Sequence, residues 1–197
     1  MLVTKVSDIL SVEDKGPARS SGLHLGSILN AVGHKMGFIR ASRAGTDPNA
    51  NDITRNNYFE TGYTVERMLE QALGDRIGTR PGEIIYDGVA CTPDGILFSP
   101  DGSVVVVEIK CTWMSIRDPA LIWKWMAQIM GYCYVLAAHD ADLHVLWING
   151  DYKPPKPVYA QYHIVFSTQE LTENWRMVLN NRSNLGSWYP PCRVYRW

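Results

Sequence analysis

The chain has 197 residues, of which 46% are hydrophobic and 20% charged, and its formal net charge is −1 at pH 7. This composition predicts a soluble globular protein, which we expect to form one domain over residues 1–197. The small net charge excludes a strong overall attraction to nucleic acid, so any contact with DNA has to be local.

Targeting and membrane signals are weak in this sequence. The longest apolar-rich segment, residues 120–138, contains Lys124 and Gln128 and therefore predicts a core helix rather than a membrane span. The N-terminus lacks the basic start and apolar stretch of a secretory signal, so we expect an intracellular, cytoplasmic protein with no membrane partner. The four cysteines show no C-x-x-C spacing, which argues against a zinc ribbon.

The N-terminal third predicts an arm, a helix and a loop. Residues 1–21 start apolar and turn polar, which predicts an arm that ends in a loop. Apolar side chains at helical spacing predict a helix over residues 23–36. The segment from residue 38 to residue 51 is polar and turn-rich, and it contains Arg40 and Arg43.

A second helix is predicted from Asp52, as its N-cap, to Leu73, with a break near Gly62. Glu66 falls at the margin of the apolar face of this helix, from where its carboxylate can reach towards a sheet edge. The alternative for Glu66 is a solvent-facing acid. Gly62 has no side chain, so it would let the helix lie close to a sheet or a DNA strand.

Strands follow the second helix. Residues 83–91 predict the first strand of a meander, and Asp87 within them is predicted to be a turn or polar-face residue. Pro100-Asp101-Gly102 has the chemistry of a tight turn, and the β-branched run after it predicts a buried strand. If Ser99 pairs with Ser103 across this turn, the numbers of paired residues in the hairpin add up to about 202.

This register brings charged residues together at one end of the hairpin. It places Asp94 opposite Glu108, with Cβ atoms roughly 4.5–5.5 Å apart, and Lys110 on the same face. Two carboxylates this close repel unless a cation lies between them, and oxygen ligands suit Mg²⁺ or Mn²⁺. Such a metal would polarise a phosphoryl oxygen and acidify a bound water, beside a lysine that orients it. The pattern favours metal-assisted phosphodiester hydrolysis; the alternative is a surface hairpin with a solvated Glu108–Lys110 pair.

Asp118-Pro119 predicts the start of a helix that runs to about Ala138. Lys124, Gln128 and Tyr132 are spaced four residues apart and form one stripe along it. Such donors with an aromatic ring can hold a phosphate backbone and stack on a base. The alternative for Tyr132 is packing in the core.

Two strands and a helix complete the chain. The strands are predicted over residues 143–148 and 158–166, and the helix starts at a capping box, Ser167-Thr168-Gln169-Glu170, and runs to about Asn180. The tail, residues 181–197, is aromatic and basic; it is predicted either to pack over the core or to contact DNA or a second subunit.

Four short motifs together resemble a known nuclease family. Pro93-Asp94, followed after thirteen residues by Glu108-Ile109-Lys110, resembles the PD-(D/E)xK nuclease signature. Gly62-x-x-x-Glu66 before it and Gln128-x-x-x-Tyr132 after it resemble the flanks of the RecB-like, lambda-exonuclease-like branch, which includes phage-type exonucleases. The resemblance implies an α/β fold with a restriction-endonuclease-like αβββαβ core, in which helices flank a mixed central sheet.

The resemblance also implies roles for individual residues. The metal ligands that it implies are Asp94, Glu108, the backbone carbonyl of Ile109, and Glu66, which would bind a second metal or its water. Lys110 would position or activate the attacking water, Gln128 and Tyr132 would orient the site or the DNA, and Lys124 would contact DNA. Some lambda-like exonucleases grip a DNA-end phosphate with an arginine before the G-x-x-x-E helix, which makes Arg40 and Arg43 candidates.

The activity implied is that of a hydrolase, a deoxyribonuclease that uses one or two Mg²⁺ or Mn²⁺ ions. We expect an exonuclease of phage-type recombination or DNA repair, in a bacterial or phage-infected cell, with DNA and a recombination or single-strand-binding protein as partners. No iron–sulfur cluster is expected, because the late cysteine trio of some RecB-like nucleases is missing. Lambda-like relatives form rings, so an oligomer stays open.

Three alternatives stay open beside the exonuclease. One is an endonuclease that acts on structured or single-stranded DNA, and another is a catalytically silent DNA-binding protein of the same fold. The third is a small metal-dependent hydrolase of nucleotides, which would require a closed pocket.

Overall fold

The computed structural model describes residues 20, 22–35, 48–149 and 157–182, with the side chains of residues 34 and 48–60 excepted. Arg40 and Arg43 lie outside the described residues, as do most of the N-terminal arm and the tail after Arg182. Within the described part, none of the helices combines the length and the apolar composition that crossing a membrane would need.

The central feature is a four-stranded mixed sheet with the strand order β4-β5-β6-β7. The strands are β4 (Gly95–Phe98), β5 (Val104–Thr112), β6 (Asp140–Trp147) and β7 (Val158–Val165). β5 pairs antiparallel with β4 and parallel with β6, while β6 and β7 are antiparallel. A smaller sheet has the order β1-β3-β2 and consists of β1 (Leu23–His24), β3 (Val89–Cys91) and β2 (Ile84–Tyr86).

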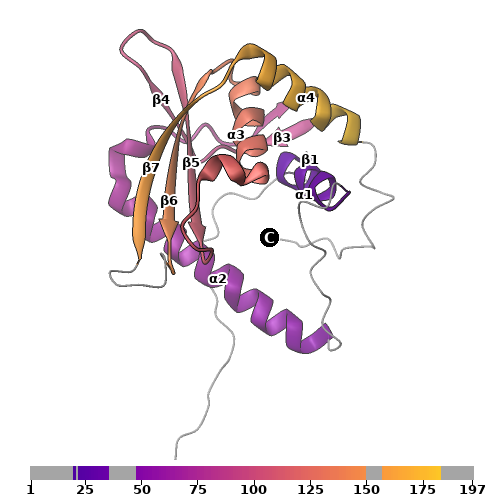
Figure 1. The fold of residues 1–197 in the computed structure, drawn as a ribbon, viewed down its shortest axis with the longest axis vertical. Helices are drawn as coiled ribbons and strands as arrows, with labels where there is room; N and C mark the ends of the chain where they lie inside the picture. Colours follow the sequence, from indigo (N-terminus) through magenta and orange to yellow (C-terminus); the bar gives the residue numbers. More distant parts are fainter. Residues whose placement is uncertain (1–19, 21, 36–47, 150–156, 183–197) are drawn as a thin grey trace, which may run out of the picture.

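Helices cover both faces of the four-stranded sheet (Figure 1). The helices are α1 (Leu25–Lys35), α2 (Pro48–Leu73), α3 (Trp123–Val135) and α4 (Thr168–Arg182). α2 packs on one face, and α3 packs on the other together with α1 and α4. The mixed α/β class predicted from the sequence is therefore confirmed.

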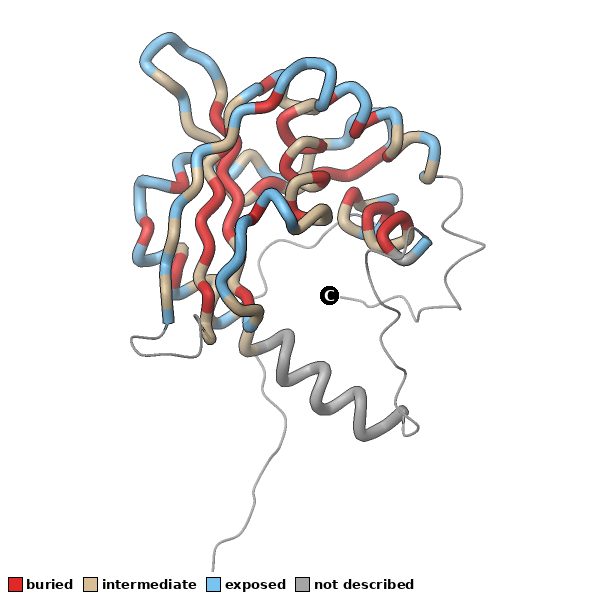
Figure 2. The backbone as a smooth tube through the Cα atoms, viewed as in Figure 1, coloured by how far each residue is buried: buried red, intermediate tan, exposed pale blue. Residues whose placement is uncertain are grey.

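Apolar side chains fill both sides of β5, which explains its run of β-branched residues. Val106 faces the large core cluster beneath α1, α3 and α4, whereas Val107 and Ile109 face α2. Figure 2 shows buried residues along the central strands and along stretches of the helices that pack on them. Because successive side chains of a strand point to opposite faces, Glu108 and Lys110 leave β5 on the side of Val106.

The predicted register of the β4–β5 hairpin is confirmed. Gly95 pairs with Val107 and Phe98 with Val104, so the numbers of paired residues add up to 202. Ser99 N donates to Ser103 O at 2.9 Å, and Gly102 takes a positive φ of 83° in the turn. Asp94, just before β4, therefore lies opposite Glu108.

The single strand predicted over residues 83–91 is wrong, because the chain folds back on itself within it. β2 and β3 are two strands joined by Asp87-Gly88, whose φ values are 49° and 75°. A two-residue loop with φ > 0 at both positions is the favoured hairpin turn, and Asp-Gly suits it. The prediction that Asp87 is a turn residue is confirmed, and its Oδ2 accepts from Trp175 Nε1 at 2.9 Å.

The second helix starts earlier than predicted and has no break. α2 begins at Pro48 rather than Asp52, since proline suits the first helical position, and it continues through Gly62. A Cβ at Gly62 would meet no described atom within 4 Å, so this glycine does not serve a close approach to the sheet. The end at Leu73 is confirmed, and Gly74 follows with a φ of 54°.

The later elements are of the predicted types, but β6 starts at Asp140 rather than residue 143, and α3 ends at Val135 and starts later than predicted. Asp118 Oδ1 accepts from Ala120 N at 2.9 Å as a cap, but it begins only a 3₁₀ turn (Pro119–Leu121), and α3 starts at Trp123. The predicted strands correspond to β6 and β7. The capping box is confirmed, because Ser167 N donates to Glu170 Oε2 at 2.8 Å and Glu170 N donates to Ser167 Oγ at 3.2 Å.

Candidate active site

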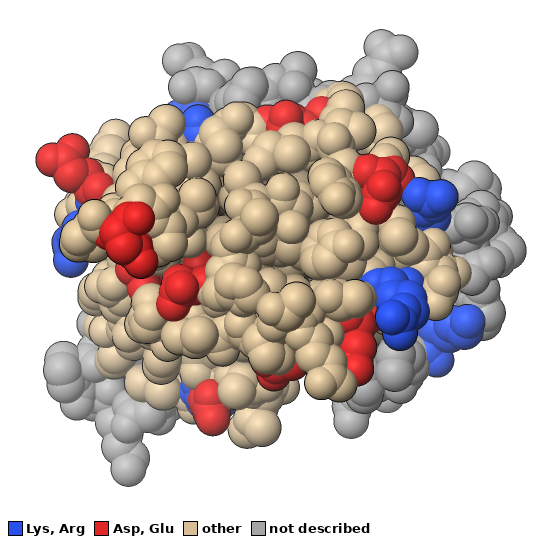
Figure 3. Space-filling view, turned by 90° about the horizontal axis from the view of Figure 1, so that it is seen from above, with Lys and Arg blue, Asp and Glu red and all other residues tan. Residues whose placement is uncertain are grey.

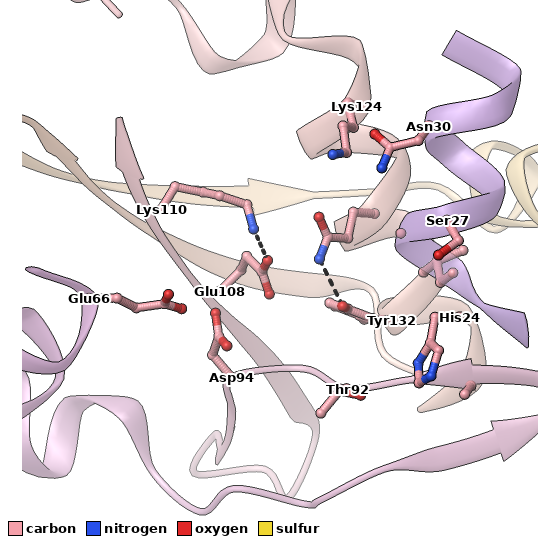
Figure 4. A pocket seen from close by; sticks show the side chains of 14 residues that line it. His24, Ser27, Asn30, Glu66, Thr92, Asp94, Glu108, Lys110, Lys124 and Tyr132 are labelled. Atoms are coloured by element: carbon pink, nitrogen blue, oxygen red, sulfur yellow. Dashed lines mark hydrogen bonds and ion pairs between the residues drawn. The ribbon is translucent and has the colours of Figure 1, made fainter. Parts of the chain in front are cut away.

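A pocket of about 350 Å³ opens between α1, α2, β5 and α3. All seven described residues that the sequence singled out by their side chains line it: Glu66, Asp94, Glu108, Lys110, Lys124, Gln128 and Tyr132. Seven others complete the lining: His24, Leu25, Gly26, Ser27, Asn30, Ala90 and Thr92. Figure 4 shows the carboxylates of Glu66, Asp94 and Glu108 turned towards one another at one end of the pocket.

The hairpin holds Asp94 against β5. Asp94 Oδ2 accepts a hydrogen bond from Ile109 N at 2.8 Å, so its carboxylate is fixed beside the residue that follows Glu108. Glu108 itself is only 1% exposed, because it leaves β5 within the core. The confirmed register and this backbone bond together bring the two acids into one place.

Gly95 positions the third acid, Glu66, relative to Asp94. A Cβ at Gly95 would lie 2.1 Å from the carbonyl oxygen of Ile77, which belongs to the 3₁₀ turn Gly74–Ile77 at the end of α2. Only glycine therefore lets this turn pack on β4, where Thr79 and Ile96 exchange two backbone hydrogen bonds of 2.9 Å. Because Glu66 lies two helical turns before Leu73, this contact sets where its carboxylate meets the hairpin.

Burial and neighbouring charges shift the pKa values of Glu66, Glu108 and Lys110. Burial raises the pKa of Glu108 to about 8, and the negative charge of Asp94 adds to the shift. Burial likewise raises the pKa of Glu66 to about 7, again with Asp94 contributing. Burial alone would lower the pKa of Lys110, but the charges of Glu108 and Asp94 outweigh it and raise that pKa above its ordinary value.

One oxygen of Glu108 is paired and the other is not. Lys110 Nζ forms an ion pair with Glu108 Oε1. Glu108 Oε2 is buried and has no hydrogen-bond partner among the described residues. A buried acceptor without a partner is costly, and carboxylate oxygens are hard donors of the kind that suit a divalent cation. As the described side chains are placed, no group of three His, Cys, Asp or Glu residues is close enough to enclose a metal ion.

The opposite wall of the pocket carries hydrogen-bond donors from α3. Gln128 Nε2 donates to the hydroxyl of Tyr132 at 2.8 Å. Tyr132 is buried in the main core cluster, which was the alternative predicted for it from the sequence. Tyr132 also lines the pocket. Burial, together with the positive charge of Lys110, lowers the pKa of Lys124.

Sequence reasoning missed the contribution of α1 and of the residue before it. Ser27, Asn30 and His24 line the pocket, although helical spacing marked only the apolar side of this segment. A Cβ at Gly131 would lie 2.6 Å from Leu25 Cδ2, so α1 packs closely on α3 at that glycine. No local pattern in the sequence predicts this contact, because it joins segments about a hundred residues apart.

Comparison with known proteins supports the fold of the chain, but it assigns neither an activity nor roles of individual residues. No protein-family model matches the sequence, and no curated protein matches it either. Among solved structures, an alkaline exonuclease from Laribacter hongkongensis is similar with a TM-score of 0.50 and 16% identity, over 84% of this chain and 88% of that chain. Its complex with dAMP gives a TM-score of 0.51 at the same identity and coverage.

The chain therefore has a nuclease-like mixed α/β fold. A phage-related exonuclease from Haemophilus somnus is a weaker neighbour, with a TM-score of 0.42 and 11% identity over 83% of this chain and 92% of that chain. At such identities a shared fold does not carry over an activity. Function has to be argued from the pocket.

Proposed function

We propose that this chain is a Mg²⁺- or Mn²⁺-dependent nuclease that hydrolyses phosphodiester bonds of DNA. The observation that carries the proposal is the convergence of Glu66, Asp94 and Glu108 on one pocket, with Lys110 paired to Glu108. The nuclease-like fold supports it, and we infer that α2, β3 to β5, α3 and β6 correspond to the αβββαβ core of PD-(D/E)xK nucleases.

The carboxylates are the proposed cation ligands. Asp94 and Glu108 would hold the ion with the carbonyl of Ile109, and Glu66 would hold a second ion or its water. A bound divalent ion supplies Lewis acidity, which polarises a phosphoryl oxygen and acidifies water. The unpartnered Oε2 of Glu108 supports this assignment, because a cation would supply the compensation that the described residues do not.

Lys110 is the proposed residue that positions the attacking water. Its pKa is raised by its acidic neighbours, so it stays protonated at neutral pH and donates hydrogen bonds rather than accepting a proton. A fixed ammonium group can orient a water and stabilise the charge that develops on the phosphoryl group. Lys124 and Gln128 would hold a neighbouring phosphate, and Tyr132 would support Gln128.

We place the activity at DNA ends, as an exonuclease of recombination or repair. The flanking motifs around Glu66 and Gln128 support this choice, and the similar exonuclease structures agree with it at the level of fold. Arg40 and Arg43 stay candidates for gripping a DNA end. A recombination or single-strand-binding protein is the proposed protein partner.

The test compares an end-labelled linear duplex with a covalently closed circle, each in Mg²⁺, in Mn²⁺ and in EDTA. We expect the linear form alone to be degraded, and only with metal. Lys110→Ala should lower the cleavage rate about 100-fold or more, the range for losing one group that stabilises developing charge. Lys35→Ala, which removes an exposed lysine of α1, is the matched control and should cleave like the wild type.

The outcomes separate the alternatives. Cutting of the closed circle would replace the exonuclease by an endonuclease. Full activity of a purified Lys110→Ala protein would refute the role given to that residue. Absence of cleavage in every metal, with DNA binding intact, would favour a catalytically silent DNA-binding protein.

A further inference from the structure

The connection between β5 and α3, residues 113–122, exposes large apolar side chains beside the pocket. Trp113 is 37% exposed, Ile116 42% and Leu121 78%. Ten large apolar side chains are exposed among the described residues, so three of them lie within this one short segment. A concentration of this kind marks a surface that contacts something.

The backbone of this segment is held in place. Asn149 Nδ2 donates to the carbonyl of Trp113 at 2.6 Å, and Met114 N donates to Thr112 Oγ1 at 3.1 Å. Met114 and Ile122 pack against the main core, and Pro119 is buried. The segment thus buries some of its apolar side chains and holds Trp113, Ile116 and Leu121 out in water, which pre-organises them for binding.

Both ends of the segment adjoin the pocket. Trp113 follows Lys110 by three residues, and Leu121 precedes Lys124 by three residues. Three residues span at most about 11 Å of chain. A DNA strand rises about 3.4 Å per nucleotide, so bases within about three nucleotides of a phosphate held at Lys110 or Lys124 come within reach of the segment. None of residues 113–122 lines the pocket itself.

We propose that residues 113–122 form a stacking platform for unpaired bases of the DNA strand whose phosphate occupies the pocket. The proposal rests on the proposed function, because DNA has to enter the pocket. Trp113 offers an aromatic face, Ile116 and Leu121 offer apolar surface, and the exposed Arg117 offers a guanidinium that can stack on a base or bind a phosphate. Paired bases cover one another's faces, so the platform selects DNA that is single-stranded or frayed next to the cleavage site.

The test measures binding without cleavage, by fluorescence anisotropy in EDTA. The probes are a labelled single-stranded oligonucleotide, an abasic oligomer of the same length, and a blunt duplex. Trp113→Ala should weaken binding of the single strand roughly 5- to 150-fold, the range for losing one stacked base. It should leave binding of the abasic oligomer unchanged, because that probe keeps the phosphates and lacks the bases.

Two variants serve as controls. Trp113→Phe keeps an aromatic face and should bind the single strand within about threefold of the wild type. Phe98→Ala removes an aromatic side chain that is more exposed than Trp113, at the other end of the β4–β5 hairpin and opposite Val104, and it should change none of the three affinities. Thermal unfolding of each variant checks that the fold persists.

The results also separate the platform from the nuclease activity. Unchanged single-strand binding by Trp113→Ala, or an equal loss for the abasic oligomer, would overturn the platform even if the wild type cleaves DNA. In the first case the segment would instead be a contact for a protein. Base-dependent loss in Trp113→Ala, in a chain that cleaves no DNA in any metal, would support the platform while the proposed activity fails.

Discussion

Folding buries the carboxyl group of Glu108, which disfavours its charged form. Its pKa of about 8 means that, between its ordinary value of 4.5 and 8, the folded protein keeps a proton that the unfolded chain has released. Stability therefore falls as the pH rises through this range, by up to about 1.4 kcal/mol per pH unit for each such group. Glu66 contributes in the same direction up to about pH 7.

The expected result is a free energy of unfolding in EDTA that decreases between pH 5 and pH 8. Glu108→Gln removes the larger of the two glutamate contributions, so the decrease should become clearly shallower. Urea unfolding at several pH values measures it, with Glu173→Gln on exposed α4 surface as the control. An unchanged pH dependence in Glu108→Gln would show that the carboxyl is not protonated in the folded protein.

Asp94 accepts a backbone hydrogen bond from Ile109 N and is also a proposed metal ligand. One substitution tests these two roles separately. Asp94→Asn keeps an oxygen that can accept from Ile109 N but removes the negative charge. We expect stability close to that of the wild type and metal affinity lower by at least about tenfold. Calorimetric titration with Mn²⁺ measures the affinity. Wild-type affinity in this variant would remove Asp94 from the ligand set.

At the scale of elements, the contact between Gly95 and Ile77 joins α2 to the hairpin. Gly95→Ala places a methyl group 2.1 Å from the Ile77 carbonyl oxygen, so the backbone has to shift. We expect a loss of about 1–3 kcal/mol in the free energy of unfolding, as for overpacked cores. Gly62→Ala is the matched control: its Cβ meets nothing described, and it should gain up to about 1 kcal/mol from helix propensity. Equal stability of the two variants would contradict this account of the contact.

Elements with local chemical signals were predictable from the sequence. The turn at Pro100-Asp101-Gly102 fixed the register that pairs Asp94 with Glu108, and the capping box at Ser167 marked the start of α4. The hairpin turn at Asp87-Gly88 also has a recognisable sequence, but it lies between two apolar runs that together resemble one strand. Turn chemistry outweighs the continuity of the run there, because both residues take positive φ.

Contacts between segments that lie far apart in the sequence could not be predicted from the sequence. The acids of the pocket were foreseen because one hairpin carries two of them. The residues of α1 were not, because Ser27 and Asn30 reach the pocket through long-range packing of α1, for example of Leu25 on Gly131 of α3. The 3₁₀ turn before α3 was missed for a local reason, since Asp118-Pro119 signals a start without fixing how far the helix continues.

At the scale of the whole molecule, the net charge of −1 gives no strong overall attraction to DNA. Figure 3 shows acidic and basic side chains scattered over one face, in line with a net charge of −1. Any attraction to DNA therefore has to be local. The pocket draws on elements from both sides of the sheet, with Glu66 from α2 and Gln128 from α3, so its geometry depends on the assembled fold.

The bonds that α4 makes to the β2–β3 turn have a consequence for a chain that is still being synthesised. Trp175 and Arg182 donate to Asp87, at 2.9 Å and 2.6 Å, and β3 in turn pairs with β1, just before α1. A nascent chain emerges from the ribosome with its acids and Lys110 well before this support exists. The bonds to Asp87 can therefore form only once residue 182 is available for folding, later than the residues that carry the acids and Lys110.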